Sequence, residues 1–445
     1  MSSSSPISIF FLLIFLLFFL AQAIVPPSKT FKFVNEGEFG QHYVEYYADY
    51  RLLPLAAPSP FALCFYTSVP HKYTLAMRMG VNTEGEPMRW VWEANRGNPV
   101  GEGATLTFGA DGNLVLADAD GRIAWQTGTA NKGVVDLQVL PNGNLVLLDR
   151  RRRFVWQSFD HPTDTLFIGQ LLRPGGPNKL VSRASIEDNS EGPYSLVLEE
   201  KRLALYLKSN NSANPILYYT SEDLGVQDGS LTKVAFTSSP TFKVREYELR
   251  LDIDVDNSTV HVMNTILATP KYNSTLSILR LEWDGNLRVH TYYDLSRFHA
   301  WELSLALFDR NVDIFDNTRR ESECHWPSKC GSLGVCEDDQ CVACPRTQGL
   351  IGWSKSCAPP ALPPCKAGAK VDYYKVEGVE HWMNKYYEGD GPTKLADCKD
   401  KCSKDCGCLG FFYKEESSTC LVVPELGTLA KVSNPSHVGY IKISN

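Results

Sequence analysis

One short phrase built from Asp, Gly and Asn occurs three times in the chain. It reads ADGNLVLAD at residues 110–118, PNGNLVLLD at residues 141–149 and, more faintly, WDGNLRV at residues 283–289. The Asp and Asn side chains could form hydrogen bonds with a ligand at each place. Alternatively, Asx-Gly-Asn forms a tight hairpin turn, because these residues tolerate a positive φ. The phrase is therefore either a repeated binding site or a repeated turn.

A second candidate for chemistry is SFDHPTDT, in which Asp160, His161 and Asp164 could serve as a base with orienting carboxylates. The sequence contains no G-x-S-x-G nucleophile motif, no H-E-x-x-H and no phosphate-binding loop to accompany them. We therefore expect no catalytic site and no cofactor, and an enzyme is the least favoured class.

The cysteines offer a third kind of chemistry. Cys341-x-x-Cys344 and Cys406-x-Cys408 could be metal or redox sites, but twelve of the thirteen cysteines crowd between Cys324 and Cys420. Such crowding is typical of disulfide-stapled modules in an oxidising compartment. Structural disulfides are favoured, and no metal site is expected.

The totals and the N-terminus indicate where the protein works. With 445 residues the chain has room for two to four domains, and its net charge of -7 argues against a nucleic-acid partner. Residues 1–23 carry an apolar run followed by Ala21 and Ala23, which predicts a signal peptide cut after Ala23. Its first residues lack Lys or Arg, which leaves an uncleaved anchor as an alternative. No later apolar stretch is long enough to span a bilayer, so we expect a secreted chain without stable membrane insertion.

The elements that must position these residues are strands. Residues 24 to about 317 alternate apolar and polar residues, with a turn every eight to twelve residues, which predicts antiparallel sheets. Pro and Gly at 171–179 suggest a boundary between a first β domain, 24–170, and a divergent second one, 171–320. Trp90, Trp92, Trp125 and Trp156 could stack on sugars, but their recurrence favours a shared core.

Other features of the chain are read more simply. Arg150–Arg153 could be a processing site or an anion patch, and its place between two strand signals favours a solvated hairpin tip. Cys64 is expected to be an unpaired, buried thiol. Asn210, Asn257 and Asn273 each begin an Asn-x-Ser/Thr sequon, which predicts N-glycosylation in a secreted chain. A cysteine module at 321–360, a Pro-rich linker and a module at 365–445 with a short disulfide-pinned helix complete the chain.

Four phrases together resemble the plant bulb-type (G-type) lectin and S-locus glycoprotein family. They are WVWEANRGNPV at 90–100, FVWQSFDHPTDTL at 154–166, CHWPSKCGSLGVC at 324–336 and DCKDKCSKDCGCLGFFY at 397–413. The resemblance covers essentially the whole mature chain, and it is strongest to the secreted, kinase-less branch with epidermis-specific glycoproteins. It implies a mainly β chain: tandem β-prism lectin domains, then an EGF-like module and an α+β PAN/apple domain.

The resemblance also implies a mannose site, written Gln-x-Asp-x-Asn-x-Val-x-Tyr, on each sheet of a prism. Residues two apart on a strand share a face, so the five side chains form one row. The first row reads Gly109, Asp111, Asn113, Val115 and Ala117; the second reads Leu140, Asn142, Asn144, Val146 and Leu148; the third keeps only Asp284 and Asn286, with Arg288 in place of Val. The first two rows lack the Gln and the Tyr of the family motif.

Disulfide pairs follow from the same resemblance. They are Cys324–Cys336, Cys330–Cys341, Cys344–Cys357, Cys398–Cys420 and Cys402–Cys408, and Cys365–Cys406 by default, although six cysteines alone allow fifteen connectivities.

Two functional hypotheses remain. The first is a secreted lectin-like glycoprotein of the extracellular space or cell wall, which binds mannose-type glycans or glycoproteins weakly and gains avidity from several sites or a homodimer. The second is a glycoprotein with inactive sugar sites that binds a protein partner through the PAN-like region.

Overall fold

The chain is almost entirely built from antiparallel strands. The computed structural model describes residues 24–81, 87–221, 230–240, 247–255, 263–270, 276–293, 300–310, 321–362 and 371–444. The chain forms two compact units, which divide between Pro162 and Thr163. The predicted signal peptide, residues 1–23, lies outside the described residues. The prediction of a mainly β chain is confirmed.

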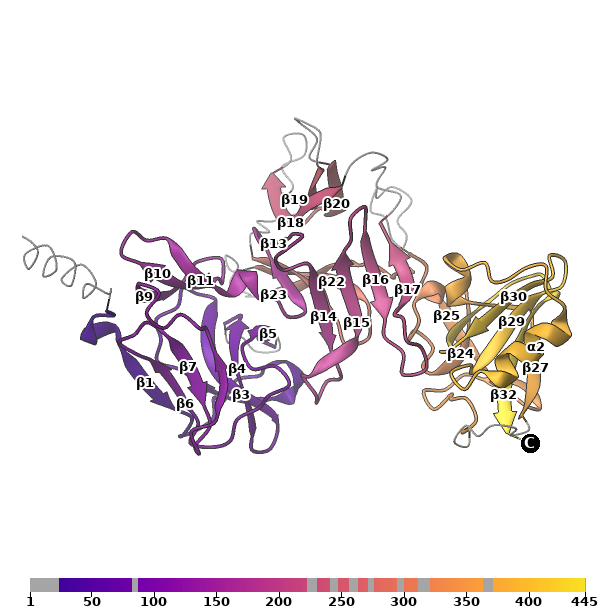
Figure 1. Cartoon of the computed structure of the whole chain (residues 1–445), viewed down its shortest axis with the longest axis horizontal. Helices are drawn as coiled ribbons and strands as arrows, with labels where there is room; N and C mark the ends of the chain where they lie inside the picture. The colour runs from indigo at the N-terminus through magenta and orange to yellow at the C-terminus, as the bar shows by residue number, and fades with distance from the viewer. Residues whose placement is uncertain are drawn as a thin grey trace, which may run out of the picture. The chain divides into compact units, whose positions relative to one another are not determined.

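The described part of the first unit contains three sheets (Figure 1). The first sheet has the order β1 (Phe31–Val34), β6 (Thr105–Phe108), β7 (Leu114–Ala117), β8 (Ile123–Gln126). The second has the order β11 (Phe154–Gln157), β10 (Leu145–Asp149), β9 (Val134–Val139). The third has the order β2 (Asp49–Leu52), β3 (Phe61–Val69), β4 (Lys72–Met79), β5 (Arg89–Glu93). Short 3-10 turns accompany them: η1 (Pro27–Lys29), η2 (Glu45–Tyr47) and η3 (Ser158–Asp160).

Each sheet of the first unit contributes one tryptophan to a shared centre. The rings of Trp92, Trp125 and Trp156 meet edge to face in all three pairings, with centroids 5.8 to 6.2 Å apart. This geometry suits the ring quadrupoles, and it joins the three sheets at one point. Trp90 packs elsewhere, stacked on Tyr66 at 4.3 Å. Trp90 and Trp92 are buried, while Trp125 and Trp156 are half-buried, so the four tryptophans pack against protein in two separate places.

The second unit begins with three four-stranded sheets. One has the order β12 (Thr165–Phe167), β21 (Ser277–Leu281), β22 (Leu287–Tyr293), β23 (Ala300–Ala306). Another has the order β13 (Leu171–Leu172), β18 (Leu231–Pro240), β19 (Tyr247–Val255), β20 (Met263–Ala268). The remaining one has the order β14 (Lys179–Arg183), β15 (Glu191–Leu198), β16 (Leu203–Leu207), β17 (Ile216–Thr220).

The C-terminal part of this unit adds two more sheets. The larger has the order β26 (Gly349–Gly352), β25 (Gln340–Arg346), β24 (Leu333–Glu337), β31 (Gly427–Lys431), β28 (Val379–His381). The other has the order β27 (Val371–Glu377), β32 (His437–Ser444), β29 (Gly410–Lys414), β30 (Thr419–Val423). The 3-10 turns here are η5 (Glu323–His325) and η6 (Trp382–Lys385).

The larger C-terminal sheet crosses from the cysteine module into the last module. Strand β24 pairs in parallel with β31, with Leu333 opposite Gly427 and Val335 opposite Leu429. The two modules are therefore joined by backbone hydrogen bonds, in addition to the linker between them. The sequence analysis did not predict this pairing.

The single described helix, α2 (Leu395–Lys404), is the short disulfide-pinned helix expected in the module at 365–445. Figure 1 shows it beside β29 and β30. Cys398 and Cys402 face inward and are fully buried, because the two positions are four residues apart on one helical face. The Cys398–Cys420 disulfide fixes the helix to β30, and Cys402–Cys408 ties it to the segment that leads into β29.

Candidate functional site

The three Asx-Gly-Asn phrases adopt one and the same hairpin turn. The central glycines, Gly112, Gly143 and Gly285, have φ of 80°, 85° and 83°. In each turn the Asx side chain accepts a hydrogen bond from the backbone N–H of the following Asn, at 3.0 to 3.2 Å. Positive φ and an Asx bond are the requirements of such a turn. The turn reading of the phrase therefore applies to all three copies.

Asn113 uses its side chain to hold its turn against the chain that follows. Its Nδ2 donates to Oε1 of Gln126 at 2.9 Å. Its Oδ1 accepts from the Thr127 hydroxyl and the Thr129 backbone N–H, both at 3.0 Å. Only 6% of Asn113 is exposed. The residue is thus a clamp inside the protein, in the middle of the predicted sugar row.

Asn144 and Asn286 play the same part in the other two copies. Asn144 donates to Gln157 at 2.9 Å and accepts from Ser158 and from the Phe159 N–H, both at 3.2 Å. Asn286 donates to the Phe308 carbonyl at 3.0 Å and accepts the Phe308 N–H at 3.1 Å. The Asn of each phrase is kept because the hairpin needs it.

In the first row, unlike the other two, some side chains keep surface that a ligand could contact. Val115 and Ala117 are half-buried on the outer face of β7, opposite the fully buried Leu114 and Leu116. Val115 lies between Thr107 on β6 and Gln126 on β8.

Several polar groups beside Val115 have no hydrogen-bond partner in the described part of the chain. The Gln126 Nε2, the Thr107 hydroxyl and the Oδ2 of the exposed Asp111 make no hydrogen bond to any described residue. An apolar patch next to unpaired donors and acceptors suits the C–H face and hydroxyls of a sugar.

The second row is closed. Val146 has no exposed surface and Leu148 is 2% exposed, so neither side chain can contact a sugar. Gln157, which corresponds to Gln126, donates its Nε2 to Asp160 at 3.0 Å. Asn142 stays exposed but serves the turn. The polar groups of this row are satisfied within the protein.

The third row has become an ionic contact. Arg288 holds Asp284 through two bonds of 2.8 and 2.9 Å, and His290 lies 3.0 Å from Glu282. Burial works against the charge of Glu282, but the hydrogen bond from His290 and the nearby Arg280 lower its pKa overall. The charges of this row pair with one another.

The cysteine module covers that third row. The indole N–H of Trp326 donates to the Asp284 carbonyl at 2.7 Å, and the Ser328 hydroxyl donates to the same oxygen at 2.5 Å. The Arg288 guanidinium lies 5.6 Å from the centre of the Trp326 ring, within cation–π distance. Trp326 therefore contacts both the backbone of Asp284 and the side chain of Arg288 in this row.

Comparison with known proteins identifies the family of the chain. Residues 89–177 match the model for D-mannose binding lectin domains. EP1-like glycoprotein 4 of Arabidopsis thaliana is 47% identical over 453 residues, which covers 100% of this chain and 98% of that protein. The chain belongs to the EP1-like glycoprotein family. The epidermis-specific secreted glycoprotein EP1 of Daucus carota is 50% identical over 82% of the chain and 96% of its own length.

More distant relatives confirm the resemblance to G-type lectins. A G-type lectin S-receptor-like serine/threonine-protein kinase of Arabidopsis thaliana is 26% identical over 80% of the chain, which spans 39% of that kinase. A PAN domain-containing protein of Arabidopsis thaliana is 27% identical over 80% of the chain and 66% of its own length.

Sequence reasoning missed Gln126, which lies opposite Val115 of the first row in this EP1-like chain. The signal was present as the dipeptide Trp-Gln, which occurs at 125–126 and again at 156–157. Each Gln follows a core Trp by one position and so turns to the outer face of its strand.

The three candidates for catalysis in SFDHPTDT each have a separate structural role. The His161 ring stacks on Trp156 at 5.3 Å, and burial lowers the His161 pKa. The Asp160 carboxylate accepts from Gln157, and Asp164 accepts from Thr165 at 2.7 Å. Among the described residues, no group of three or more His, Cys, Asp or Glu could hold a metal ion.

The arginine run forms the tip of the β10–β11 hairpin. Asp149 accepts the backbone N–H of Arg151 and of Arg153, at 2.8 and 3.0 Å. Arg152 has φ of 63° and reaches Asp136 at 3.1 Å. The run is therefore a turn held by carboxylates, with its side chains in solvent.

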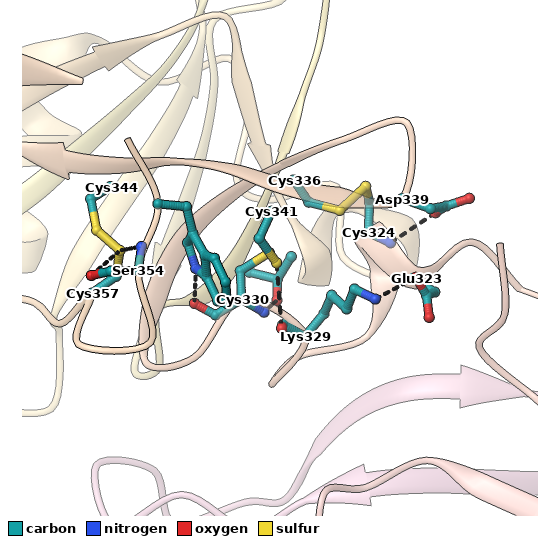
Figure 2. Close-up of a disulfide and its surroundings, with 12 residues drawn as sticks. Glu323, Cys324, Lys329, Cys330, Cys336, Asp339, Cys341, Cys344, Ser354 and Cys357 are labelled. Carbon is teal, nitrogen blue, oxygen red and sulfur yellow. Dashed lines mark hydrogen bonds and ion pairs between the residues drawn. A yellow bond between two sulfur atoms is a disulfide. The ribbon is translucent and has the colours of Figure 1, made fainter. Parts of the chain in front are cut away.

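The cysteine module is held by three disulfides, which Figure 2 shows spread along it. Across the described residues five disulfides are present: Cys324–Cys336, Cys330–Cys341, Cys344–Cys357, Cys398–Cys420 and Cys402–Cys408. These join five of the six pairs named from the resemblance. Cys406 is disulfide-bonded, and its expected partner Cys365 lies outside the described residues.

Hydrogen bonds support the disulfides of this module. The Cys324 N–H donates to Asp339 at 3.3 Å (Figure 2). The Trp353 indole donates to the Cys330 carbonyl at 3.3 Å. The module thus needs only a small apolar core, as is usual for disulfide-rich modules.

Two further predictions concern single residues. Cys64 is unpaired and fully buried, and burial raises its pKa to about 12. Asn210 is exposed, while Asn257 and Asn273 lie outside the described residues.

No described helix is long and apolar enough to cross a membrane.

Proposed function

We propose that this EP1-like protein is a secreted, lectin-like glycoprotein of the extracellular space or cell wall. It binds mannose-type glycans, or glycoproteins that carry them, weakly and without catalysis. The proposal is supported by the match to D-mannose binding lectin domains and by the similarity to the epidermis-specific secreted glycoprotein EP1 of Daucus carota.

The site we assign is the first row. One observation carries this assignment. Beside Val115, the amide nitrogen of Gln126 and the hydroxyl of Thr107 have no hydrogen-bond partner among the described residues, whereas the amide nitrogen of Gln157 in the second row donates to Asp160. We therefore assign a structural role, and no sugar contact, to the candidate residues of the second row, Asn142, Asn144 and Val146.

Weak binding follows from what the first row lacks. Gly109 and Ala117 stand where the family motif has Gln and Tyr. Each missing hydrogen bond costs roughly 0.5 to 1.5 kcal/mol, so two of them reduce affinity by about one to two orders of magnitude. Several chains, or a homodimer, would restore avidity on a surface rich in glycans.

We also propose how the chain divides into domains. Three sheets that share one tryptophan centre support a β-prism in the first unit. Three four-stranded sheets support a second prism, which we assign to 171–320, and β12 (Thr165–Phe167) joins one of these sheets from just before that range. We assign residues 24–170 to the bulb-type lectin domain, 321–360 to an EGF-like module and 365–445 to a PAN/apple domain. The exposed Asn210 is the sequon that we expect to carry a glycan.

The test measures high-mannose glycan binding to the full protein by calorimetry. Asp111→Ala and Gln126→Ala should each weaken binding several-fold, while the matched control Gln157→Ala should leave affinity unchanged. Asn113 is avoided because its loss disturbs the hairpin itself. If wild-type protein binds no high-mannose glycan, or if both first-row variants bind as well as wild type, the assignment is wrong.

The closed second and third rows favour one alternative, a glycoprotein with inactive sugar sites that binds a protein partner through the PAN-like region. Pull-down from an extracellular extract with the full chain separates the two. A partner retained in excess mannose favours the alternative, and elution by mannose favours the lectin.

A further inference from the structure

A turn in the first unit exposes two tyrosine rings to solvent, and hydrogen bonds hold the backbone of this turn in place. Tyr47 is 86% exposed and Tyr43 is 48% exposed, and their ring centroids lie 6.0 Å apart. Tyr46, between them in sequence, is half-buried against the cluster around Trp90. The chain therefore turns one tyrosine inward and two outward.

The turn is anchored on both sides. The Glu45 N–H donates to the Met88 carbonyl at 2.8 Å, and the Met88 N–H donates to the Tyr43 carbonyl at 3.1 Å. The Glu45 carboxylate accepts the Trp90 N–H at 2.7 Å and pairs with Arg89 at 3.3 Å. The two outward rings are thus held on a rigid support, so little ordering entropy is lost when a ligand stacks on them.

The backbone of this turn is unusual for its residues. Tyr46 and Tyr47 have φ of 65° and 51° in succession. The left-handed conformation is costly for side chains with a Cβ, and Gly or Asn would adopt it more readily. A turn selected for stability alone would not place tyrosine at Tyr47, where the ring meets mainly solvent. Strain kept at an exposed aromatic residue points to a function for the ring.

The surroundings match a neutral sugar better than a protein. The residues that precede the pair, Gln41 and His42, are exposed and polar. Burial, the neighbouring Tyr47 and Glu45 all raise the pKa of Tyr43, which favours its neutral phenol. Protein interfaces bury about 800 Å² on each partner around a desolvated centre. Two rings with a polar rim suit one or two pyranoses instead.

We propose that Tyr43 and Tyr47 form a second carbohydrate platform, outside the three sugar rows, that stacks against neutral pyranose rings of an oligosaccharide. Ring faces contact the C–H face of the sugar, and the phenol hydroxyls bond its hydroxyl groups. This platform needs none of the first-row residues, so it is independent of the mannose assignment.

The experiment is calorimetry of the full protein with mannohexaose and with cellohexaose. Tyr47→Ala and Tyr43→Ala should each weaken binding of at least one of them about five- to tenfold. Tyr47→Phe should keep most of the affinity, because the ring face remains. The matched control is Phe154→Ala, which removes a ring that is 50% exposed elsewhere in the same unit.

A further variant separates function from structure. Tyr47→Asn should raise or preserve the melting temperature, because Asn tolerates positive φ, while it abolishes the platform's share of binding. A structural role would instead lower the melting temperature.

The outcomes decide between the sites. Loss of binding in Gln126→Ala, with full binding in Tyr47→Ala, would overturn the platform and leave the first row standing. The reverse result would support the platform and overturn the first row. No binding of either oligosaccharide by wild type, or a protein ligand whose capture depends on Tyr47, would overturn the platform.

Discussion

The side-chain nitrogen of Asn113 lies 2.9 Å from Oε1 of Gln126, and this bond ties a hairpin turn to the last strand of its sheet. The family motif would use an Asn at this position to bind sugar. Here the Asn is 6% exposed, and its oxygen is shared by two further protein donors. The first prediction tests which role dominates.

Asn113→Ala should destabilise the protein by about 2–3 kcal/mol, because the Thr129 N–H is left buried without an acceptor and Gln126 loses its donor. Urea unfolding of the wild type and the variant measures the difference. Asn142→Ala, at an exposed turn position, is the control and should cost less than about 1 kcal/mol. A variant of unchanged stability that has lost sugar binding would contradict the clamp.

The contact of Trp326 with the third hairpin gives the second prediction. Trp326→Phe keeps the ring but removes the indole N–H that donates to the Asp284 carbonyl. That carbonyl still accepts from Ser328, so the loss should be about 1 kcal/mol. Trp283→Phe is the matched control, because Trp283 is 41% exposed in the same turn.

Hydrogen exchange locates the Trp326 effect. We expect faster exchange in the turn around Gly285 and in the cysteine module, with β14 and β15 unaffected. Equal exchange in Trp326→Phe and Trp283→Phe would show that the indole bond does not hold the module on this row.

The sequence predicted the local features of this fold and missed the contacts between distant segments. Alternation over 105–117 predicted β6 and β7 because the side chains of a strand alternate between its two faces. Asx-Gly-Asn predicted the hairpins because the φ preference of glycine is local. Nothing local marks Trp326 as the cover of Asp284, 42 positions earlier.

For the candidate site too, the sequence predicted the residues of the motif but not which copy of the motif is exposed. Asp111 and Val115 were identified from the motif, and both lie at the open row. Val146 matches the motif equally well, yet it has no exposed surface. Exposure depends on what the rest of the unit packs against a row, so motif matching alone could not separate the first copy from the second.

Cys64 gives a prediction with a pH dependence. Burial raises the pKa of its thiol from 9.0 to about 12 in the folded protein. Unfolding exposes the thiol, which then ionises above its ordinary pKa and favours the unfolded state. The contribution of Cys64 to stability is therefore complete below about pH 9 and is lost as pH rises towards 12.

The measurement is the free energy of unfolding of wild type and Cys64→Ala between pH 8 and pH 11. Wild-type stability should fall relative to the variant by up to about 1.4 kcal/mol per pH unit above the unfolded pKa. The native thiol should also resist a thiol-specific disulfide reagent and react once the protein is unfolded. Rapid labelling of the native protein at neutral pH would contradict the burial.

The parallel pairing of β24 with β31 predicts that the last two modules fold as one. Val335 and Leu429 pair across this junction, and neither has exposed surface. Thr428, also fully buried, accepts the Cys330 N–H and donates to the Pro327 carbonyl, both at 3.1 Å. A fragment of residues 321–445 should unfold in one cooperative transition. Residues 365–445 alone lack β24, and they should be unfolded or prone to aggregate through the bare edge of β31.

Gly427→Val in the full chain tests the same junction without truncation. Gly427 has φ of +64°, and a Cβ there would stand 2.4 Å from the Pro327 carbonyl oxygen. The variant should destabilise both modules together. Thermal unfolding should then show a single transition, at a lower temperature than in the wild type. Gly349→Val is the control, because Gly349 also has positive φ, at +115°, but open space around it. If residues 365–445 fold alone with the stability of 321–445, the pairing adds no stability, and the PAN-like module could bind a partner independently of its neighbour.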